Sequence, residues 1–312
     1  MSLPASPRES ARWRSRTGPL GLHLFNRVTG TNVLLDEVRC PVEGWSRAPR
    51  SLSIALLDAC DLSCSFCYAP KTVNRLGAAE VLAWTRELSE NGTFNIGFGG
   101  GEPTLHPDFA RICRDISVET GVAVSFTTHG YHLPKVAGSL HGSVNFIRVS
   151  MDGVGPTYER IRRRPFDQFL AALQVALTVS PVGVNYVVNA DTLSELDDAA
   201  DLVLRLGVRE LLLLPQMDGG VPSLSAEHAA RLSSWVAENH RHVPVRVSAM
   251  AMGLLGEDVP VLPVDEPDSR RQYLHIDAAR TLKTCSHASS GYQIAAGESI
   301  MDAIDKILRS TQ

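Results

Sequence analysis

Three cysteines lie close together in the sequence, at Cys60, Cys64 and Cys67, and their C-x3-C-x2-C spacing directly follows an apolar run. A closed structural zinc site needs four ligands, and its C-x2-C knuckles normally come in pairs, but no second pair exists in this chain. A [4Fe-4S] cluster accepts cysteine thiolates, and three of them would leave one iron without a protein ligand. The spacing therefore favours an iron–sulfur cluster; a zinc site and three incidental thiols are the alternatives.

Aromatic residues flank the last of these cysteines, Phe66 before it and Tyr68 after it, and Gly-Gly-Gly-Glu-Pro-Thr occupies residues 99–104. From about residue 51 to 215 the chain thereby resembles the radical S-adenosylmethionine (radical SAM) superfamily. The resemblance implies one [4Fe-4S] cluster on the three cysteines, with S-adenosylmethionine chelating the open iron. It also implies reductive cleavage of S-adenosylmethionine to a 5′-deoxyadenosyl radical, which abstracts hydrogen from a substrate.

The resemblance implies further which residues contact S-adenosylmethionine. Glycines permit close backbone approach and an ammonium needs acceptors, so residues 99–104 should surround the methionine amino end; an ordinary turn is the alternative. Arg162 could pair with the cofactor carboxylate, although a solvated helix face also explains the arginines of 160–164. Asn189 has an ordinary turn as its other interpretation, and Asp152 is expected to shape a turn. The expected cofactor contacts are Tyr68, Gly100, Gly101, Glu102, Pro103, Ser150, Arg162 and Asn189.

Two residues are candidates for a catalytic role. His129 either faces substrate or is an ordinary loop histidine. Cys285 could return a hydrogen atom to a substrate radical, as an epimerase requires, or it could be a structural thiol. Of the other cysteines, Cys113 lies on the apolar face of an expected helix and should be in the core, and Cys40 has no evident partner.

These residues need a scaffold that brings them together. Apolar and β-branched runs alternate with helical periodicity, and such alternation implies parallel strands joined by crossovers. Combined with the resemblance, this predicts an α/β fold, a (β/α)6 partial TIM barrel. Ligand-binding loops follow the carboxyl ends of such strands, so the cysteines, the glycines, His129, Asp152, Asn189 and Gln216 should converge on one face. The expected strands are 51–57, 94–98, 122–127, 145–150, 182–188 and 210–214, and the expected helices are 78–90, 107–120, 158–178 and 194–206.

Segments on either side of the barrel complete the expected organisation. Residues 1–18 are rich in Arg, Ser and Pro and are expected to be a mobile tail, and 19–50 a β-hairpin cap. Residues 51–217 are the expected barrel, and 218–312 a small α+β extension. The extension resembles that of peptide-modifying radical SAM enzymes, but it keeps only Cys285 of the cysteines that an auxiliary cluster requires, so none is expected. Its expected elements are helices 226–239 and 299–308, strands 243–247, 273–277 and 282–285, and a connector over 258–270.

Composition narrows the possible partners. The 312 residues with 44% hydrophobic content can bury the core of one large domain, and a formal net charge of -4 makes nucleic acid an unlikely partner. The sequence contains no apolar run that could cross a bilayer and no secretory signal pattern. Crowded, unevenly spaced cysteines fit a reducing compartment. A cytoplasmic protein is expected, with no membrane partner.

The expected function is radical chemistry on a ribosomally made peptide, by cross-linking, epimerisation or a related modification. The peptide substrate is implied by the extension alone. The same chemistry on a small metabolite of natural-product biosynthesis is the first alternative, and a noncatalytic cluster scaffold or sensor is the second. A flavodoxin or ferredoxin is the expected electron donor.

Overall fold

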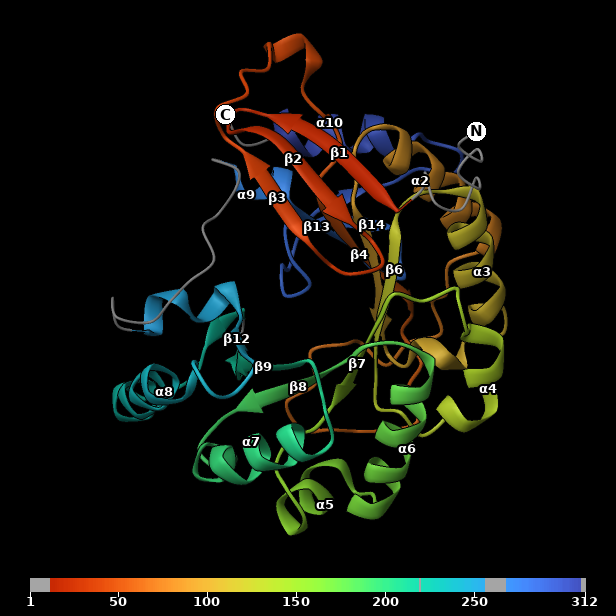
Figure 1. Ribbon diagram of the computed structural model, residues 1–312. Coiled ribbons are helices and arrows are strands. Elements are labelled where there is room, and N and C mark those ends of the chain that lie inside the picture. The colour runs from red at the N-terminus through yellow and green to blue at the C-terminus, as the bar shows by residue number, and fades with distance from the viewer. Residues whose placement is uncertain (1–11, 219, 256–267, 310–312) are drawn as a thin grey trace, which may run out of the picture.

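The central feature of the protein is one large, twisted sheet, which the computed structural model describes within residues 12–218, 220–255 and 268–309 (Figure 1). Among these residues the sheet has ten strands, in the order β12-β9-β8-β7-β6-β5-β4-β13-β14-β15. All pairs from β12 to β13 are parallel, and the last two pairs are antiparallel. The strands are β4 Ser51–Leu57, β5 Asn95–Gly100, β6 Ala123–Thr128, β7 Phe146–Ser150, β8 Val182–Val188, β9 Glu210–Pro215, β12 Val245–Val247, β13 Tyr273–Ile276, β14 Thr281–Lys283 and β15 Tyr292–Gln293.

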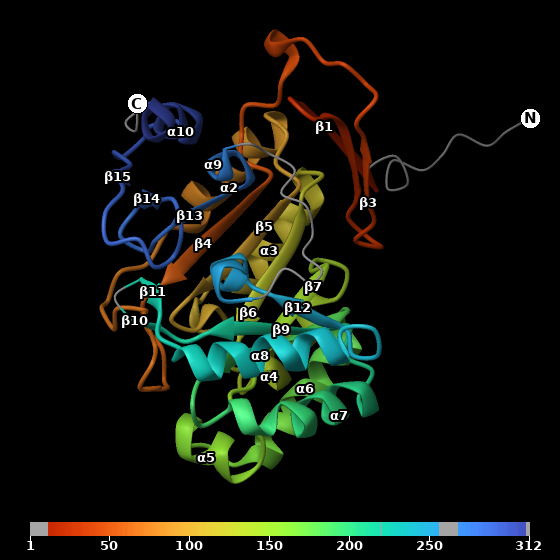
Figure 2. The same ribbon diagram turned by 90° about the vertical axis from the view of Figure 1, so that its left-hand side faces the viewer.

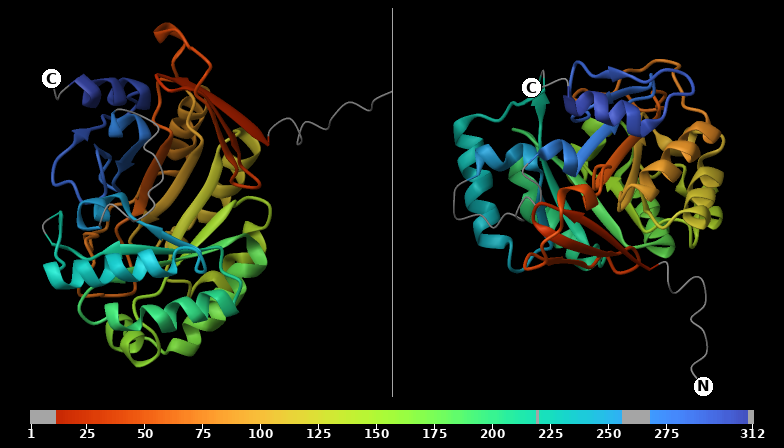
Figure 3. Two further views of the ribbon diagram at one scale, coloured as in Figure 1. Left: turned by 60° about the vertical axis from the view of Figure 1, so that its left-hand side comes forward. Right: turned by 90° about the horizontal axis from the view of Figure 1, so that it is seen from above.

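Helices cover the outer face of this sheet, as the view from above in Figure 3 shows. They pack through apolar stripes; in α2, for example, Val81, Trp84 and Leu88 are buried. The sheet curves without closing, since no ladder joins its two edges in the described part of the chain. The helices are α2 Ala78–Glu90, α3 Phe109–Glu119, α4 Leu133–Leu140, α5 Pro156–Arg162, α6 Phe166–Val179, α7 Leu196–Arg205, α8 Ala226–Asn239, α9 Ser269–Gln272 and α10 Ile300–Arg309.

The expected α/β partial barrel is confirmed. Its six strands, β4 to β9, are all parallel and lie next to one another in chain order. The extension is not a separate unit beside the barrel but continues its sheet. Strand β12 pairs with β9 and β13 pairs with β4, at the two edges of the barrel (Figure 2). Edge strands carry unpaired backbone groups, which these additions satisfy.

The N-terminal region departs from the expected mobile tail. The expected hairpin is present as β2 Gly21–Asn26 and β3 Asn32–Leu35, but β1 Trp13–Gly18 precedes it and pairs with β2 in antiparallel register. The expectation is therefore wrong for residues 12–18, whereas 1–11 lie outside the described residues. One of the arginines there is not solvated: Arg16 is buried and donates to the carbonyl oxygen of Ala48 at 3.2 Å, whereas Arg12 is exposed.

This three-stranded sheet docks at the amino ends of the barrel strands. The Phe25 ring stacks on that of Phe94, which immediately precedes β5, at a centroid distance of 5.3 Å. Arg27 donates to the carbonyl oxygen of Thr120 at 3.1 Å, in the turn before β6. The N-terminal sheet thus caps the end of the barrel opposite to the cysteines, which follow the carboxyl end of β4.

Some smaller expectations about secondary structure also differ from the structure. The helix expected over 158–178 is broken into α5 and α6, because Arg163 adopts a left-handed φ of 53° and Pro165 follows. Helix α4 and strand β15 were not expected. Most of the expected connector 258–270 lies outside the described residues, and its end forms part of α9.

Two short strands, β10 Met217–Asp218 and β11 Val221–Pro222, form a separate ribbon. No described helix is long and apolar enough to span a membrane.

Candidate active site

The loop that carries the three cysteines packs directly on the glycine-rich turn after β5. The backbone N–H of Gly101 donates to the Leu57 carbonyl oxygen at 2.7 Å, and that of Glu102 donates to Ala59 at 2.9 Å. A Cβ on Gly101 would lie 2.0 Å from the Ala59 oxygen, and one on Gly100, whose φ is +116°, would lie 2.3 Å from the Leu57 oxygen. The two glycines are therefore required for the two loops to meet.

The donor set of the cysteine loop fits an iron–sulfur cluster. Cys60 and Cys64 are half-buried and Cys67 is exposed. Burial raises the pKa of the Cys60 and Cys64 thiols. A bound metal overcomes this because it deprotonates the thiols that coordinate it. The remaining cysteines, Cys40, Cys113 and Cys285, come from other elements, and Cys113 is in the core as expected.

Arg162 reaches this loop from the end of α5. One terminal nitrogen forms an ion pair with Asp152, and the other donates to the Cys64 Sγ at 3.6 Å. Its Nε is buried and has no hydrogen-bond partner among the described residues, so it can still serve an acceptor such as a ligand carboxylate. Burial lowers the pKa of Arg162, but Asp152 and Cys64 outweigh it and raise the pKa overall. The guanidinium is therefore permanently charged.

Asp152 was expected on the ligand-binding face of the barrel, but its ion pair with Arg162 was not predicted from the sequence. It is completely buried, and its Oδ1 accepts the Val187 backbone N–H at 2.9 Å. The expectation that it merely shapes a turn is wrong, since its carboxylate is the partner of Arg162. Its position just after β7 placed it on that face in the sequence analysis, because ligand loops lie at that end of a parallel strand.

Glu102 connects the glycine-rich turn to the end of β6. Its buried carboxylate accepts hydrogen bonds from the Thr104 hydroxyl at 2.5 Å, the Thr128 hydroxyl at 2.7 Å and the His129 backbone N–H at 2.9 Å. Pro103, also buried, begins a short 3-10 helix that Glu102 caps. These contacts rigidify the turn beside the cysteine loop.

His129 binds the cysteine loop itself. Its Nδ1 accepts the Tyr131 backbone N–H at 3.2 Å, so its Nε2 carries the proton and donates to Asp61 Oδ1 at 2.8 Å. His132 Nε2 lies 3.2 Å from Asp61 Oδ2. Burial raises the pKa of Asp61, but the hydrogen bond from His129 helps to lower it overall. His129 thus holds Asp61, the neighbour of Cys60; Asp61 and His132 were not singled out from the sequence.

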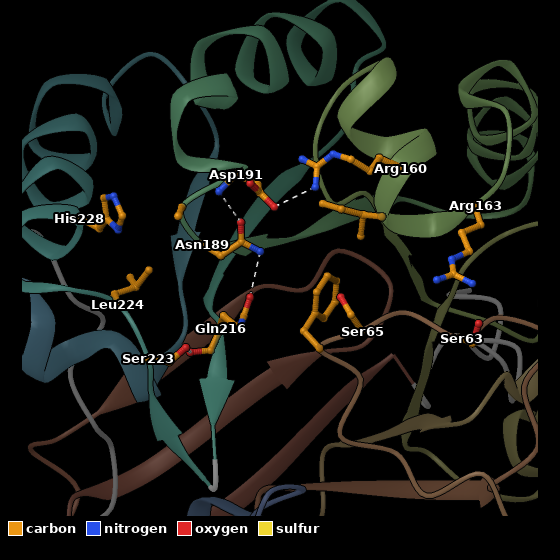
Figure 4. Close-up of a pocket in the computed structure, with 13 residues that line it drawn as sticks. Ser63, Ser65, Arg160, Arg163, Asn189, Asp191, Gln216, Ser223, Leu224 and His228 are labelled. Atoms are coloured by element: carbon orange, nitrogen blue, oxygen red, sulfur yellow. Dashed lines mark hydrogen bonds and ion pairs between the residues drawn. The ribbon is translucent and has the colours of Figure 1, made fainter.

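A first cavity, of about 420 Å³, lies between the cysteine loop and the ends of β8 and β9 (Figure 4). Asn189 lines it, and its Nδ2 donates to Gln216 Oε1 at 3.0 Å. The Asn189 Oδ1 accepts the backbone N–H groups of Asp191 at 2.9 Å and Thr192 at 3.0 Å, so Asn189 also shapes its turn. The side chain of Phe66 enters the same cavity from the cysteine loop. Ser150, at the end of β7, is not among the residues that line either cavity described here.

A second cavity, of about 770 Å³, separates the cysteine loop from the extension. Cys67, Tyr68 and Gly100 line one side, and the Tyr68 ring lies 4.4 Å from that of His287. On the other side, burial lowers the pKa of His275 to about 4, so this imidazole is neutral. Ser286 and His287 line the cavity, whereas Cys285 does not. Its charged lining residues are Asp58, Asp218, Asp277 and Lys283.

Comparisons with known proteins identify this arrangement. Residues 54–203 match the Radical SAM superfamily. A protein named "Probable GTP 3′,8-cyclase" from Saccharolobus solfataricus is 28% identical over 192 residues, 59% of this chain. The chain spans only 62% of the length of that relative.

Solved structures match over more of the chain. SuiB of Streptococcus suis, solved with its precursor peptide SuiA, is 14% identical, with a TM-score of 0.73 over 97% of this chain and 90% of its own. The enzyme anSMEcpe, solved with AdoMet and the Cp18Cys peptide, is 14% identical, with a TM-score of 0.62 over 85% of this chain and 81% of its own. At this identity the likeness establishes the fold. The matched residues 54–203 contain both the three-cysteine loop and the glycine-rich turn, and this part of the chain is a radical SAM domain; enzymes of that superfamily use a [4Fe-4S] cluster and S-adenosylmethionine.

Proposed function

We propose that this protein initiates radical chemistry on a peptide substrate. The observation that carries the proposal is the position of Cys60, Cys64 and Cys67 at the carboxyl end of β4, against the glycine-rich turn and between two cavities. Three thiolates on one loop leave a cluster iron open to a further ligand. S-adenosylmethionine, bound there and reduced, supplies the radical that abstracts hydrogen from substrate.

Residues around the cysteine loop are suited to the cofactor. Asn189 and Gln216 line the first cavity, Gly100 lines the second, and Arg162 and Gly101 line neither. The unpartnered Nε of Arg162 is a donor for its carboxylate, and the turn at Gly100 and Gly101 offers close backbone approach to its amino end. The amide side chains of Asn189 and Gln216 can bind the polar edge of the nucleoside. Ser150 and Tyr68 stay proposed contacts on resemblance alone.

The second cavity is the proposed substrate site, and its charge disfavours a nucleoside triphosphate. Lys283 is the one Lys or Arg among the described residues that line it, and Lys283 Nζ already pairs with Asp277 Oδ2 at 2.9 Å. Asp58 and Asp218 add negative charge, which repels phosphates. A GTP substrate, such as the name of the curated relatives implies, therefore fits this cavity poorly. The likeness to SuiB extends through the extension that lines it and supports a peptide.

Anaerobic reconstitution tests the chemistry directly. With dithionite and S-adenosylmethionine, the protein is expected to release 5′-deoxyadenosine, measured by mass spectrometry, and Cys67→Ala should abolish the release. Cys40→Ala, at a half-buried thiol outside the cysteine loop, is the matched control and should keep it. No 5′-deoxyadenosine from a protein with an intact cluster would refute the proposal. Dithionite replaces the proposed flavodoxin or ferredoxin donor.

The substrate class is tested with two kinds of candidate substrate, each offered separately. Precursor peptides encoded beside the gene, and GTP, are each offered to the reconstituted protein, and loss of hydrogen or a new bond is sought by mass spectrometry. Modification of a peptide supports the proposal. Conversion of GTP with no peptide modified would favour the small-metabolite alternative instead.

The proposed single cluster and the role of Cys285 have separate tests. Iron analysis should give about four irons per chain, whereas about eight would reveal an auxiliary cluster. Cys285→Ala tests the proposed hydrogen donor. Unchanged turnover and an unchanged product would remove Cys285, and the epimerase chemistry built on it, from the mechanism.

A further inference from the structure

Arg162 differs from the other arginines on its stretch of chain in being enclosed. Its side chain is 11% exposed and its partner Asp152 is 1% exposed. Arg160, two residues earlier, is 58% exposed and pairs with Asp191, which is 54% exposed. Figure 4 shows this pair. Among the side-chain contacts recorded for the described residues, Arg162 alone of the arginines donates to a sulfur of the cysteine loop. The chain has therefore buried a complete ion pair immediately beside Cys64.

Burying two charges is costly unless both are held in good geometry. Asp152 is held, because its Oδ1 accepts the Val187 backbone N–H from β8 at 2.9 Å. Its Oδ2 then binds one terminal nitrogen of Arg162, which directs the other terminal nitrogen to the Cys64 Sγ at 3.6 Å. A fixed, permanent positive charge thus lies next to one of the three thiols.

We propose that Asp152 is a positioning residue that holds Arg162 against Cys64, and that the Arg162 charge raises the reduction potential of the cluster. The inference rests on the proposed binding of the cluster by Cys60, Cys64 and Cys67. Hydrogen bonds to cluster sulfurs and nearby charge both set such potentials. Reduction adds an electron, so a nearby cation favours the reduced form.

The test is the midpoint potential of the reconstituted cluster, measured by a redox titration monitored by electron paramagnetic resonance without S-adenosylmethionine. Arg162→Gln is expected to shift the potential to more negative values. Arg162→Lys, which keeps the charge, should have a midpoint potential close to that of the unmodified protein. Arg111→Gln removes an exposed arginine that pairs with Asp108 on α3, and its potential should equal that of the unmodified protein.

Removing Arg162 alone leaves Asp152 buried without its cation and risks misfolding. The double variant Asp152→Asn with Arg162→Gln avoids this unpaired charge and should still have a more negative potential, because Arg162 contacts the Cys64 Sγ whereas no contact of Asp152 with that sulfur is recorded among the described residues. A double-mutant cycle isolates the positioning role. If Asp152 positions Arg162, Asp152→Asn shifts the potential by different amounts with and without Arg162. Equal shifts would overturn the positioning role.

Iron content separates the two levels of the proposal. An unmodified protein that binds no cluster would refute the proposed function and this inference with it. A cluster of full iron content in Arg162→Gln with an unchanged potential would refute the inference alone. A negative shift in Arg162→Gln, with rescue in Arg162→Lys and no shift in Arg111→Gln, would establish it.

Discussion

At the scale of single residues, the site depends on two glycines as much as on its cysteines. Gly100 and Gly101 place the turn after β5 within hydrogen-bonding distance of Leu57 and Ala59, at the root of the cysteine loop. A side chain on either would meet a backbone oxygen, which cannot rotate away as a side chain can. The glycines therefore determine where the thiols lie.

Gly101→Ala should consequently destabilise the protein and impair cluster binding. Its Cβ would lie 2.0 Å from the Ala59 oxygen, and such overpacking costs about 1 to 3 kcal/mol. Iron content after reconstitution and the melting temperature should both fall. Gly99→Ala is the control, because its Cβ would meet nothing within 4 Å. Equal iron content in the two variants would contradict this account.

At the scale of elements, the N-terminal sheet is bound to the barrel through a buried histidine. His23 of β2 packs edge-on against Phe94 at a centroid distance of 5.0 Å, and its Nε2 lies 3.1 Å from Asn32 Oδ1. Burial, with the charge of Arg50, lowers the pKa of His23 to about 4. The folded state therefore holds this imidazole neutral at neutral pH.

Acid should weaken the protein in a defined window. Between pH 6.5 and about 4 the unfolded His23 binds a proton that the folded residue does not, so stability falls as pH falls through this range. The loss is at most about 3 kcal/mol for one such histidine. Urea unfolding at several pH values should show it, and His23→Gln should reduce it.

Two other histidines serve as comparisons when unfolding is measured at several pH values. His275, whose pKa is also about 4, should account for acid sensitivity that remains in His23→Gln. His141→Gln, at an exposed histidine, should behave as the unmodified protein. An identical pH profile for His23→Gln and the unmodified protein would show that His23 is not responsible.

At the scale of the whole molecule, the extension belongs to the barrel's own sheet. Leu274 and Ile276 of β13 and Leu282 of β14 are completely buried, and β13 pairs with β4, the strand that leads into the cysteine loop. The extension also lines one side of the second cavity. A defect in the extension should therefore reach the cluster through β4.

Leu274→Ala tests this dependence. Removing this buried side chain should cost about 2 to 5 kcal/mol in the free energy of unfolding, measured by urea denaturation. Cluster retention should fall in parallel. Val118→Ala, at a position 79% exposed on α3, should change neither quantity. Normal cluster retention in a strongly destabilised Leu274→Ala would mean that the extension and the cysteine loop are energetically independent.

The sequence by itself determined the local features of this protein. Ser51–Leu57, Val182–Val188, Ala78–Glu90 and Ala226–Asn239 match the expected elements residue for residue, because each has clear periodicity and ends at turn-forming residues. The three cysteines and the glycine-rich motif are each short, local patterns, so the type and spacing of the cysteines indicated an iron–sulfur cluster, and the resemblance of both motifs to the radical SAM superfamily implied S-adenosylmethionine. The expectation for β1 failed because its arginines indicated a solvated tail. In the structure, Arg14 donates to the Ser89 carbonyl oxygen and Arg16 donates to that of Ala48.

Only the tertiary structure decided which distant residues meet. Arg162 contacts Cys64, Asp61 pairs with His129, and β13 pairs with β4 across more than two hundred residues of chain. Such partnerships depend on the order and register of parallel strands, which bring loops far apart in sequence to one end of the barrel. No local pattern encodes them, because each side chain alone would suit a turn or a solvated surface equally well.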